Sequence, residues 1–293
     1  MAPRASCLEN SAVVLTGNLL PHGYGTMQLA GRGVWGPPPD WDASVTLLRH
    51  AYDLGVRLFD SAWYYGPEVT HRLIAEALSP YPPDLVVVTK AGNSRGTDRS
   101  WVPALKPQQL QDACRTDIRL LQVRVLPLVL LRWHPMSDDE GDFLKAVAAL
   151  LQLRDIGDIA QIGLSNITMR HIDLASQILP IAAVSNAFSV TSRRDADVVD
   201  WCTARRVPYL AYYPLLGGDA VRQPAVQRVA RELGVMPAQV ALAWLRARSP
   251  LIVPIPGTRN PRHLEENVAA DRIVLSTEHI AALNRGVRTI SAS

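Results

Sequence analysis

The hydrophobic positions alternate along the chain between short, continuous apolar runs and longer stretches with helical spacing. Continuous apolar runs are typical of strands that are buried on both faces, as in a parallel sheet. The segments between them predict helices with recognisable ends, since Pro107 stands at a first helical position and Gly55 follows the end of another helix. Strands are predicted at 23–27, 57–60, 85–89, 128–131, 159–165, 181–186, 207–213 and 251–256, and helices at 42–54, 68–78, 107–121, 141–155, 169–179, 195–206 and 237–248.

This alternation favours one architecture. Eight strands, each separated by about one helix, are the content of a closed (β/α)8 barrel of roughly 250 residues, and the chain has 293 residues. A doubly wound open sheet is the alternative, and the length alone would also fit two ordinary domains. No internal repeat, low-complexity segment or linker marks a domain boundary. We therefore predict a single α/β domain over residues 1–293, a (β/α)8 TIM barrel with a short N-terminal β-hairpin.

Polar residues stand where the predicted strands end. In a barrel the carboxyl ends of all strands meet at one rim, which is where active sites are built. Several polar strand ends in one chain therefore predict a site at this rim. They are Asp60, Lys90, Arg132, Ser165 with Asn166, Asn186, and Tyr212 with Tyr213.

The residues at the second and third strands suggest a chemistry. Lys90 follows three valines, and a buried lysine needs a counter-ion, for which Asp60 at the end of the neighbouring strand is the natural candidate. Tyr65 lies one short loop beyond Asp60. A cation beside the tyrosine hydroxyl is expected to lower its pKa from about 10, so that Tyr65 donates a proton to a carbonyl oxygen. The alternative is an ion pair that only holds two strands together.

Composition and charge exclude other classes of protein. The net charge is +3, the few lysines (Lys90, Lys106 and Lys145) are far apart, and the arginines are scattered, which argues against a nucleic-acid partner. The three cysteines, Cys7, Cys114 and Cys202, show no CxxC spacing, and no metal-ligand pattern is present. The sequence carries no signal-peptide pattern and no run long enough to span a membrane, so we predict a soluble, cytoplasmic protein without a membrane partner.

Six motifs occur in the order and spacing of one known family. They are GYGTMQL, LFDSAWYYG, VVVTKAG, IGLSN, YYPL and IPGTRNPRHLEEN, and they run from Gly23 to Asn267. In these motifs the chain resembles the aldo-keto reductases. The stretches MQLAGRGVWGPP, YYGPEVTHRLIAEALSPYPPDL and SWVPALKP further resemble a bacterial branch of that family that reduces pyridoxal.

The resemblance implies roles for individual residues. It implies a catalytic set of Asp60, Tyr65 and Lys90, with Tyr65 as the general acid, and NADPH as the cofactor. Ser165 and Asn166 match the pair that holds the nicotinamide carboxamide, and Tyr212 matches the aromatic platform under its ring. The residues that match the segment binding the adenosine 2′-phosphate and adenine are Thr258, Arg259, His263, Glu266 and Asn267.

The chain departs from the family pattern at three points. Arg132 stands where the family usually has a catalytic histidine; it cannot act as an acid or base, but it can polarise a carbonyl, lower the pKa of Tyr65 or neutralise an anionic substrate such as the pyridoxal 3-oxide. His134, two residues on, is the alternative replacement. Ser185 replaces the usual glutamine against the nicotinamide. Gly257 and His263 replace a lysine and an arginine near the 2′-phosphate, and Arg259 is the candidate to compensate for the lost charge.

One further pattern is discounted. Gly31 to Gly36 spell GxGxxG, but three prolines follow, so no phosphate-binding helix is expected to begin there. Trp35, Trp41, Trp63 and Trp101 fall in or near the predicted rim loops and are candidates for an aromatic pocket wall.

Taken together, the residues and the resemblance predict an NADPH-dependent reductase of a small aldehyde or ketone, with a pyridoxal-like, aromatic or anionic carbonyl compound as the substrate. We expect either a monomer or a homo-oligomer. The alternatives are a tailoring ketone or imine reductase in a specialised pathway, an NADPH-binding regulatory barrel with little turnover, and redox-neutral chemistry on the same barrel.

Overall fold

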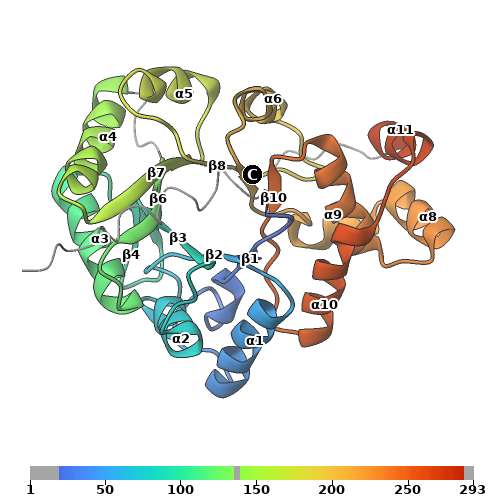
Figure 1. Cartoon of the computed structure of the whole chain (residues 1–293), viewed down its shortest axis with the longest axis horizontal. Coiled ribbons are helices and arrows are strands. Elements are labelled where there is room, and N and C mark those ends of the chain that lie inside the picture. The colour runs from blue at the N-terminus through green and yellow to red at the C-terminus, as the bar shows by residue number, and fades with distance from the viewer. Residues whose placement is uncertain (1–19, 135–138, 287–293) are drawn as a thin grey trace, which may run out of the picture.

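The computed structural model describes residues 20–134 and 139–286, and eight parallel strands form the centre of the molecule. The strands follow one another in the sheet in their order along the chain, and helices surround them (Figure 1). The strands of this sheet are β1 (Tyr24–Gly25), β2 (Leu58–Asp60), β3 (Val86–Ala91), β6 (Leu126–Arg132), β7 (Ile159–Ser165), β8 (Val184–Ser185), β9 (Tyr209–Ala211) and β10 (Ile252–Pro254).

Backbone hydrogen bonds between the first and last strands close the sheet into a barrel. The Gly23 N–H donates to Pro254 O at 2.8 Å, and the Gly25 N–H donates to Pro256 O at 3.1 Å. Glycine is required at this seam, because a Cβ on Gly25 would lie 2.7 Å from the oxygen of Ile255 and one on Gly257 would lie 2.4 Å from the oxygen of Gly25. The (β/α)8 barrel is therefore confirmed over the doubly wound open sheet.

Helices cover the outside of the barrel, and their boundaries follow local signals. The Asp40 side chain accepts from the Ala43 N–H at 2.9 Å and caps the first helix, and Pro107 opens the third. Two helices, α8 and α11, lie outside the ring against α9 (Figure 1). The helices are α1 (Trp41–Asp53), α2 (Val69–Leu78), α3 (Pro107–Leu121), α4 (Glu140–Asp155), α5 (Met169–Ser176), α6 (Ala196–Arg205), α7 (Asp219–Arg222), α8 (Pro224–Leu233), α9 (Pro237–Arg248), α10 (Pro261–Ala269) and α11 (Thr277–Gly286), with short 3₁₀ turns at Met27–Leu29, Leu216–Gly218 and Ala270–Arg272.

The core has two parts, set by the twofold alternation of side chains along each strand. One alternate set faces the barrel interior and the other packs against the helices. On β3, for example, Val86 and Val88 lie in the interior cluster, whereas Val87 and Ala91 lie in the outer one. The interior cluster consists of Leu58, Val86, Val88, Leu128, Leu130, Ala183, Leu210, Val253 and Ile255.

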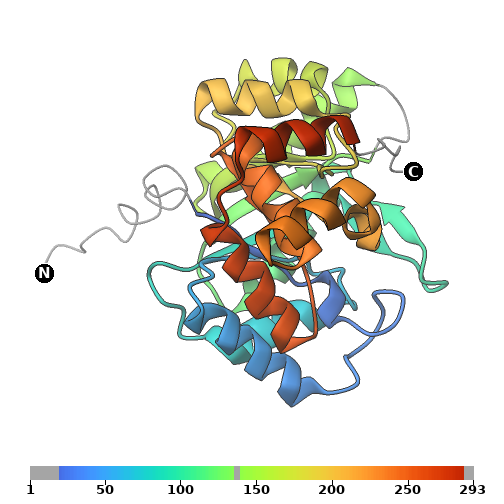
Figure 2. The ribbon, with the colours of Figure 1, turned by 90° about the vertical axis from the view of Figure 1, so that its right-hand side faces the viewer.

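Several expectations differ from the structure in detail. The first strand is only Tyr24–Gly25, because the chain turns into a 3₁₀ helix at Met27. The helix expected to reach residue 179 ends at Ser176. A hairpin of β4 (Asn93–Arg95) and β5 (Trp101–Pro103) stands out from the barrel after β3 (Figure 2). This hairpin was not predicted, and neither were the helices α7, α8, α10 and α11. The predicted N-terminal hairpin lies outside the described residues, and so does Cys7.

Within the described part of the chain, no helix is long and apolar enough to cross a membrane. The same residues contain no cluster of three or more His, Cys, Asp or Glu side chains placed to hold a metal ion.

Candidate active site

The polar residues at the strand ends converge because their side chains lie on the same face of each strand as the residues that fill the barrel interior. Asp60 follows Leu58 by two positions, Lys90 follows Val88, and Arg132 follows Leu130, and each of these hydrophobic residues belongs to the barrel interior. The register of β6 and β7 also pairs Arg132 with Ser165 at the same rim. Strand alternation therefore brings polar side chains together above an apolar barrel core, as the positions in the sequence predicted.

A buried ion pair forms the floor of this site. Lys90 Nζ lies 2.6 Å from Asp60 Oδ1 and also donates to the main-chain oxygen of Ser61 at 3.0 Å. Lys90 is 2% exposed and Asp60 is 4% exposed, so bulk water screens their attraction only weakly. The ring of Tyr65 lies over the ammonium, with its centroid 5.3 Å from Lys90 Nζ. The three residues expected to act together are thus in contact.

The electrostatics of this group keep Lys90 charged and Tyr65 protonated. Burial alone would lower the pKa of Lys90, but the Asp60 carboxylate raises it above its ordinary value. Burial raises the pKa of Tyr65 above 10.0, and Lys90 and Arg132 offset this only in part. The expectation that the neighbouring cation brings the pKa of Tyr65 below that of a free tyrosine is therefore wrong in its net sign, because desolvation of the phenolate is the larger effect.

Arg132 places a second cation beside this group without a carboxylate partner among the described residues. Its guanidinium donates to Ser165 Oγ at 3.4 Å and lies 5.4 Å from the ring centroid of Tyr212. A guanidinium is not deprotonated in proteins, so Arg132 remains charged in this half-buried position. His134 is exposed and also lines the cavity described below.

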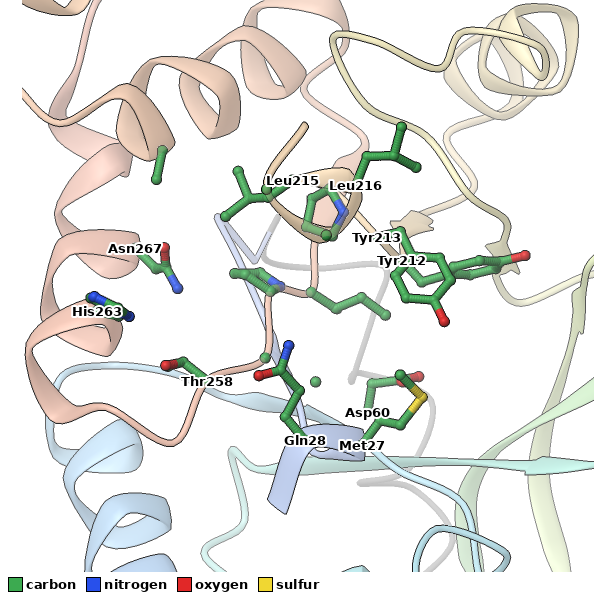
Figure 3. Close-up of a pocket in the computed structure, with 18 of the residues that line it drawn as sticks. Met27, Gln28, Asp60, Tyr212, Tyr213, Leu215, Leu216, Thr258, His263 and Asn267 are labelled. Carbon is green, nitrogen blue, oxygen red and sulfur yellow. The ribbon is translucent and has the colours of Figure 1, made fainter. Parts of the chain in front are cut away.

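A cavity of about 1090 Å³ opens above the ion pair. Asp60, Met27 and Tyr212 lie at one end, and Thr258, His263 and Asn267 lie at the other, with Leu215 and Leu216 between them on the opposite wall (Figure 3). The cavity is therefore elongated, and it connects the carboxyl end of β2 with the first turns of α10.

The residues predicted to bind a cofactor fall into three groups. Thr258, His263, Glu266 and Asn267 line the cavity, as does Tyr212. Arg259 does not: it is exposed and borders a separate groove with Asp40 at the start of α1. The remaining three, Ser165, Asn166 and Ser185, lie directly behind the lining, next to Arg132 and Tyr212.

The contacts behind the lining are specific. Asn166 adopts a positive φ of 59°, and its Nδ2 donates to the Trp133 oxygen at 2.7 Å while its Oδ1 accepts from the Tyr212 hydroxyl at 3.4 Å. The hydroxyl of Ser185 is buried and makes no hydrogen bond within the described part of the chain. The Asn186 side chain does not line the cavity. Instead it accepts from the Ile167 N–H and donates to the Ile167 oxygen.

One of the wall residues proposed from the sequence lines the cavity, and the structure adds others. Trp101, at the start of β5, meets the rings of Tyr64 and Tyr65 edge-on, at centroid distances of 5.8 Å and 6.3 Å. Of the four tryptophans proposed as wall residues, it is the one that lines the cavity. The segments 213–218 and 236–238, which precede α7 and begin α9, form the remaining wall. The Gly217-Gly218 pair was the available sign of an irregular loop here.

The GxGxxG segment forms a loop and not the start of a helix, as expected from its prolines. Gly33 and Val34 of this loop line the cavity. Arg95 of the β4–β5 hairpin ties the loop in place, donating to the Val34 oxygen at 2.7 Å and lying 4.1 Å from the Trp101 ring centroid.

Comparison with known proteins identifies the family of this chain. The model of the aldo/keto reductase family matches residues 22–287, and the chain belongs to that family of oxidoreductases. Pyridoxine 4-dehydrogenase of Escherichia coli is 42% identical over 266 residues, which are 89% of this chain and 93% of that protein. An uncharacterized oxidoreductase of Schizosaccharomyces pombe is 34% identical over 263 residues, 89% of this chain and 85% of that protein.

Solved structures show the same barrel. A thermostable aldo-keto reductase in complex with the inhibitor epalrestat has a TM-score of 0.76 and 26% identity, and the match covers 90% of this chain and 94% of that one. An aldo-keto reductase from Klebsiella pneumoniae in complex with NADPH has a TM-score of 0.76 and 24% identity, and the match covers 93% of this chain and 92% of that one.

The buried ion pair makes a prediction about stability. Asp60→Asn leaves the Lys90 ammonium buried without a counter-ion, so we expect the free energy of unfolding to fall by about 3–5 kcal/mol. Urea denaturation at neutral pH measures this loss. The double variant Asp60→Asn/Lys90→Met removes both charges and is expected to recover most of it. A loss below about 1 kcal/mol in the single variant would show that the pair is not desolvated as the structure has it.

Proposed function

We propose that this protein is an NADPH-dependent reductase of small aldehydes or ketones, and that its preferred substrates are aromatic carbonyl compounds bearing a negative charge, such as pyridoxal. The observation that carries this proposal is the placement of the protonated Tyr65 over the Lys90–Asp60 pair, at the floor of a cavity that also holds the unpaired cation of Arg132.

The cavity fits the proposed cofactor in its shape and in the residues that line it. It extends from the catalytic group to Thr258, His263 and Asn267, as an extended dinucleotide requires (Figure 3). Tyr212 offers a ring for the nicotinamide to lie against, with Ser165, Asn166 and the unpartnered Ser185 hydroxyl behind it. The exposed Arg259 and His263 are free to approach a 2′-phosphate at the other end. When bound, NADPH supplies the hydride for the carbonyl carbon.

The chain's own residues supply the proton. Tyr65 carries its proton at neutral pH, since its pKa lies above the ordinary value of 10.0, so the hydroxyl is able to donate to a carbonyl oxygen in the cavity. The phenolate that forms lies beside the Lys90 ammonium, and Asp60 holds that ammonium in place at 2.6 Å. Catalysis is then electrostatic: the positive charge is fixed before the negative charge develops, and no reorganisation of water is needed.

Arg132 supports the choice of substrate. A guanidinium without a carboxylate partner among the described residues offers hydrogen-bond donors to an anion in the cavity. Tyr64 and Trp101 supply aromatic surface beside it. An aromatic aldehyde with a ring oxide or carboxylate matches both features, and pyridoxal is such a compound. The resemblance to a pyridoxine 4-dehydrogenase points to the same substrate class.

Tyr65→Phe tests the proton donor. We expect NADPH oxidation with pyridoxal and a panel of aromatic aldehydes to fall by about 10²–10⁴-fold, since the general acid is removed, while NADPH still quenches the protein fluorescence on binding. Tyr52→Phe, which removes a hydroxyl on the outer helix α1, is the matched control and should retain full activity.

Two results would contradict this reading. Turnover of Tyr65→Phe equal to that of the wild type would exclude Tyr65 as the donor. Tight NADPH binding by the wild type without turnover of any carbonyl compound would instead favour a regulatory barrel.

Arg132→Met tests the substrate class. We expect kcat/KM for pyridoxal and for 4-carboxybenzaldehyde to fall by about 10–100-fold, the value of a hydrogen bond to a charged group, and kcat/KM for neutral benzaldehyde to fall by less than about threefold. Arg132→Lys keeps the charge and should recover part of the loss. An equal loss with charged and neutral aldehydes would show that Arg132 acts on the carbonyl and not on a substrate anion.

A further inference from the structure

A buried polar cluster lies on the helix-facing side of the two strands that carry Asp60 and Lys90. It lies outside the cavity lining, and all of its side chains are at most 1% exposed. Ser61 follows Asp60 in the sequence, and Thr89 precedes Lys90. Both side chains point away from the barrel interior because side chains alternate along a strand. The members of this histidine cluster are Ser61, Thr70, His71, Thr89 and Asp117.

The cluster is connected to the lysine ammonium through the main chain of Ser61. The Ser61 oxygen accepts from Lys90 Nζ at 3.0 Å, and the Ser61 N–H donates to Val88 O at 2.8 Å. The Ser61 side chain is held from the other side by His71 Nδ1, at 3.1 Å from its Oγ. Displacing Ser61 therefore displaces one of the two groups that fix the ammonium.

His71 joins the two sides of the cluster through both of its ring nitrogens. Its Nδ1 lies 3.1 Å from Ser61 Oγ, and Ser61 Oγ also lies 3.0 Å from the Thr70 hydroxyl. Thr70 in turn donates to the Ala62 oxygen at 3.3 Å.

The other ring nitrogen faces Thr89 and Asp117. His71 Nε2 lies 3.2 Å from Thr89 Oγ1 and 3.0 Å from Asp117 Oδ1, and Thr89 donates its hydroxyl hydrogen to Asp117 Oδ2 at 2.8 Å. His71 therefore bridges Ser61 on one side and Thr89 with Asp117 on the other.

We propose that His71 and Asp117 are positioning residues, whose buried contacts fix Ser61 and Thr89 and thereby hold the Lys90 ammonium beneath Tyr65. Neither residue touches the cavity, so neither is a catalytic residue. The pair binds one neighbour of each catalytic partner: Ser61 follows Asp60, and Thr89 precedes Lys90. A buried polar pair adds little net stability over apolar residues, so fixing these two neighbours is the effect that distinguishes it. The catalytic consequence rests on the proposed reductase function.

The test uses Lys90 itself as a probe. The chain has three lysines, and Lys106 and Lys145 are exposed, so in protein labelled with ¹⁵N-lysine only the Lys90 ammonium is shielded from solvent exchange. Lys90→Met assigns its signal. Ser61→Ala removes the hydroxyl that His71 holds, while leaving the Asp60–Lys90 ion pair and the His71–Asp117 contact intact. We expect hydrogen exchange of the Lys90 ammonium to accelerate and kcat for an aromatic aldehyde to fall, each about tenfold, the value of one hydrogen bond, with the NADPH dissociation constant unchanged.

A second variant removes the His71–Asp117 pair as a unit. His71→Asn/Asp117→Asn should change the Lys90 exchange rate and kcat in the same direction as Ser61→Ala. His22→Asn is the matched control, because His22 is also buried and paired with an aspartate, Asp271, but stands before the first strand at the opposite end of the barrel. It should leave both measurements at the wild-type value even if it lowers the melting temperature.

The inference is overturned if Ser61→Ala and His71→Asn/Asp117→Asn leave the exchange of the Lys90 ammonium at the wild-type rate, whatever they do to the melting temperature. A wild-type protein that reduces no carbonyl compound would contradict the proposed function alone, since the exchange measurement needs no turnover and still decides the positioning role.

Discussion

The ion pair between Asp60 and Lys90 is the interaction on which the site depends. Its atoms are 2.6 Å apart in the top layer of the barrel interior, directly above a layer of leucine and valine side chains. In such surroundings a lone charge would be neutralised, so each partner is charged only because the other is present. The fixed ammonium lies beside the ring of Tyr65. The Tyr65 hydroxyl keeps its proton in this buried position, and a phenolate formed there would meet a positive charge already in place.

The barrel converts a simple alternation into this geometry. Strands β2, β3 and β6 place Leu58, Val88 and Leu130 inside the barrel, and two residues later the same phase delivers a carboxylate, an ammonium and a guanidinium to one rim. The interior residues are required for packing and the rim residues for chemistry. The intervening positions face the helices, which is how the histidine cluster comes to lie behind the ion pair and not in the cavity.

The barrel and its catalytic floor could be predicted because they depend on local patterns. Apolar runs and turn signals locate the strands, and Asp60, Lys90 and Arg132 follow from their ends. The pKa of Tyr65 could not be predicted, because it depends on how burial and Lys90 balance in three dimensions. The walls were predicted only in part. Trp101 was one of four candidate wall tryptophans, and its place depends on a hairpin that Arg95 holds against Val34, a residue distant in the sequence. The partners of His71 come from separate elements, so its place in a buried cluster could not be read from the sequence.

The central claim is that a protonated Tyr65 donates to the substrate, and the pH dependence of kcat in both directions tests it most directly. Burial raises the pKa of Tyr65 above its ordinary value of 10.0, so the acid form predominates below that pH. Aldehyde reduction should therefore be constant through the neutral range and decline only above about pH 10, while alcohol oxidation with NADP⁺, which needs the phenolate, should rise with pH over that range. A reduction rate that falls with an apparent pKa of about 6–7, the ordinary range of histidine, and that persists in Tyr65→Phe, would contradict the account and point to another donor.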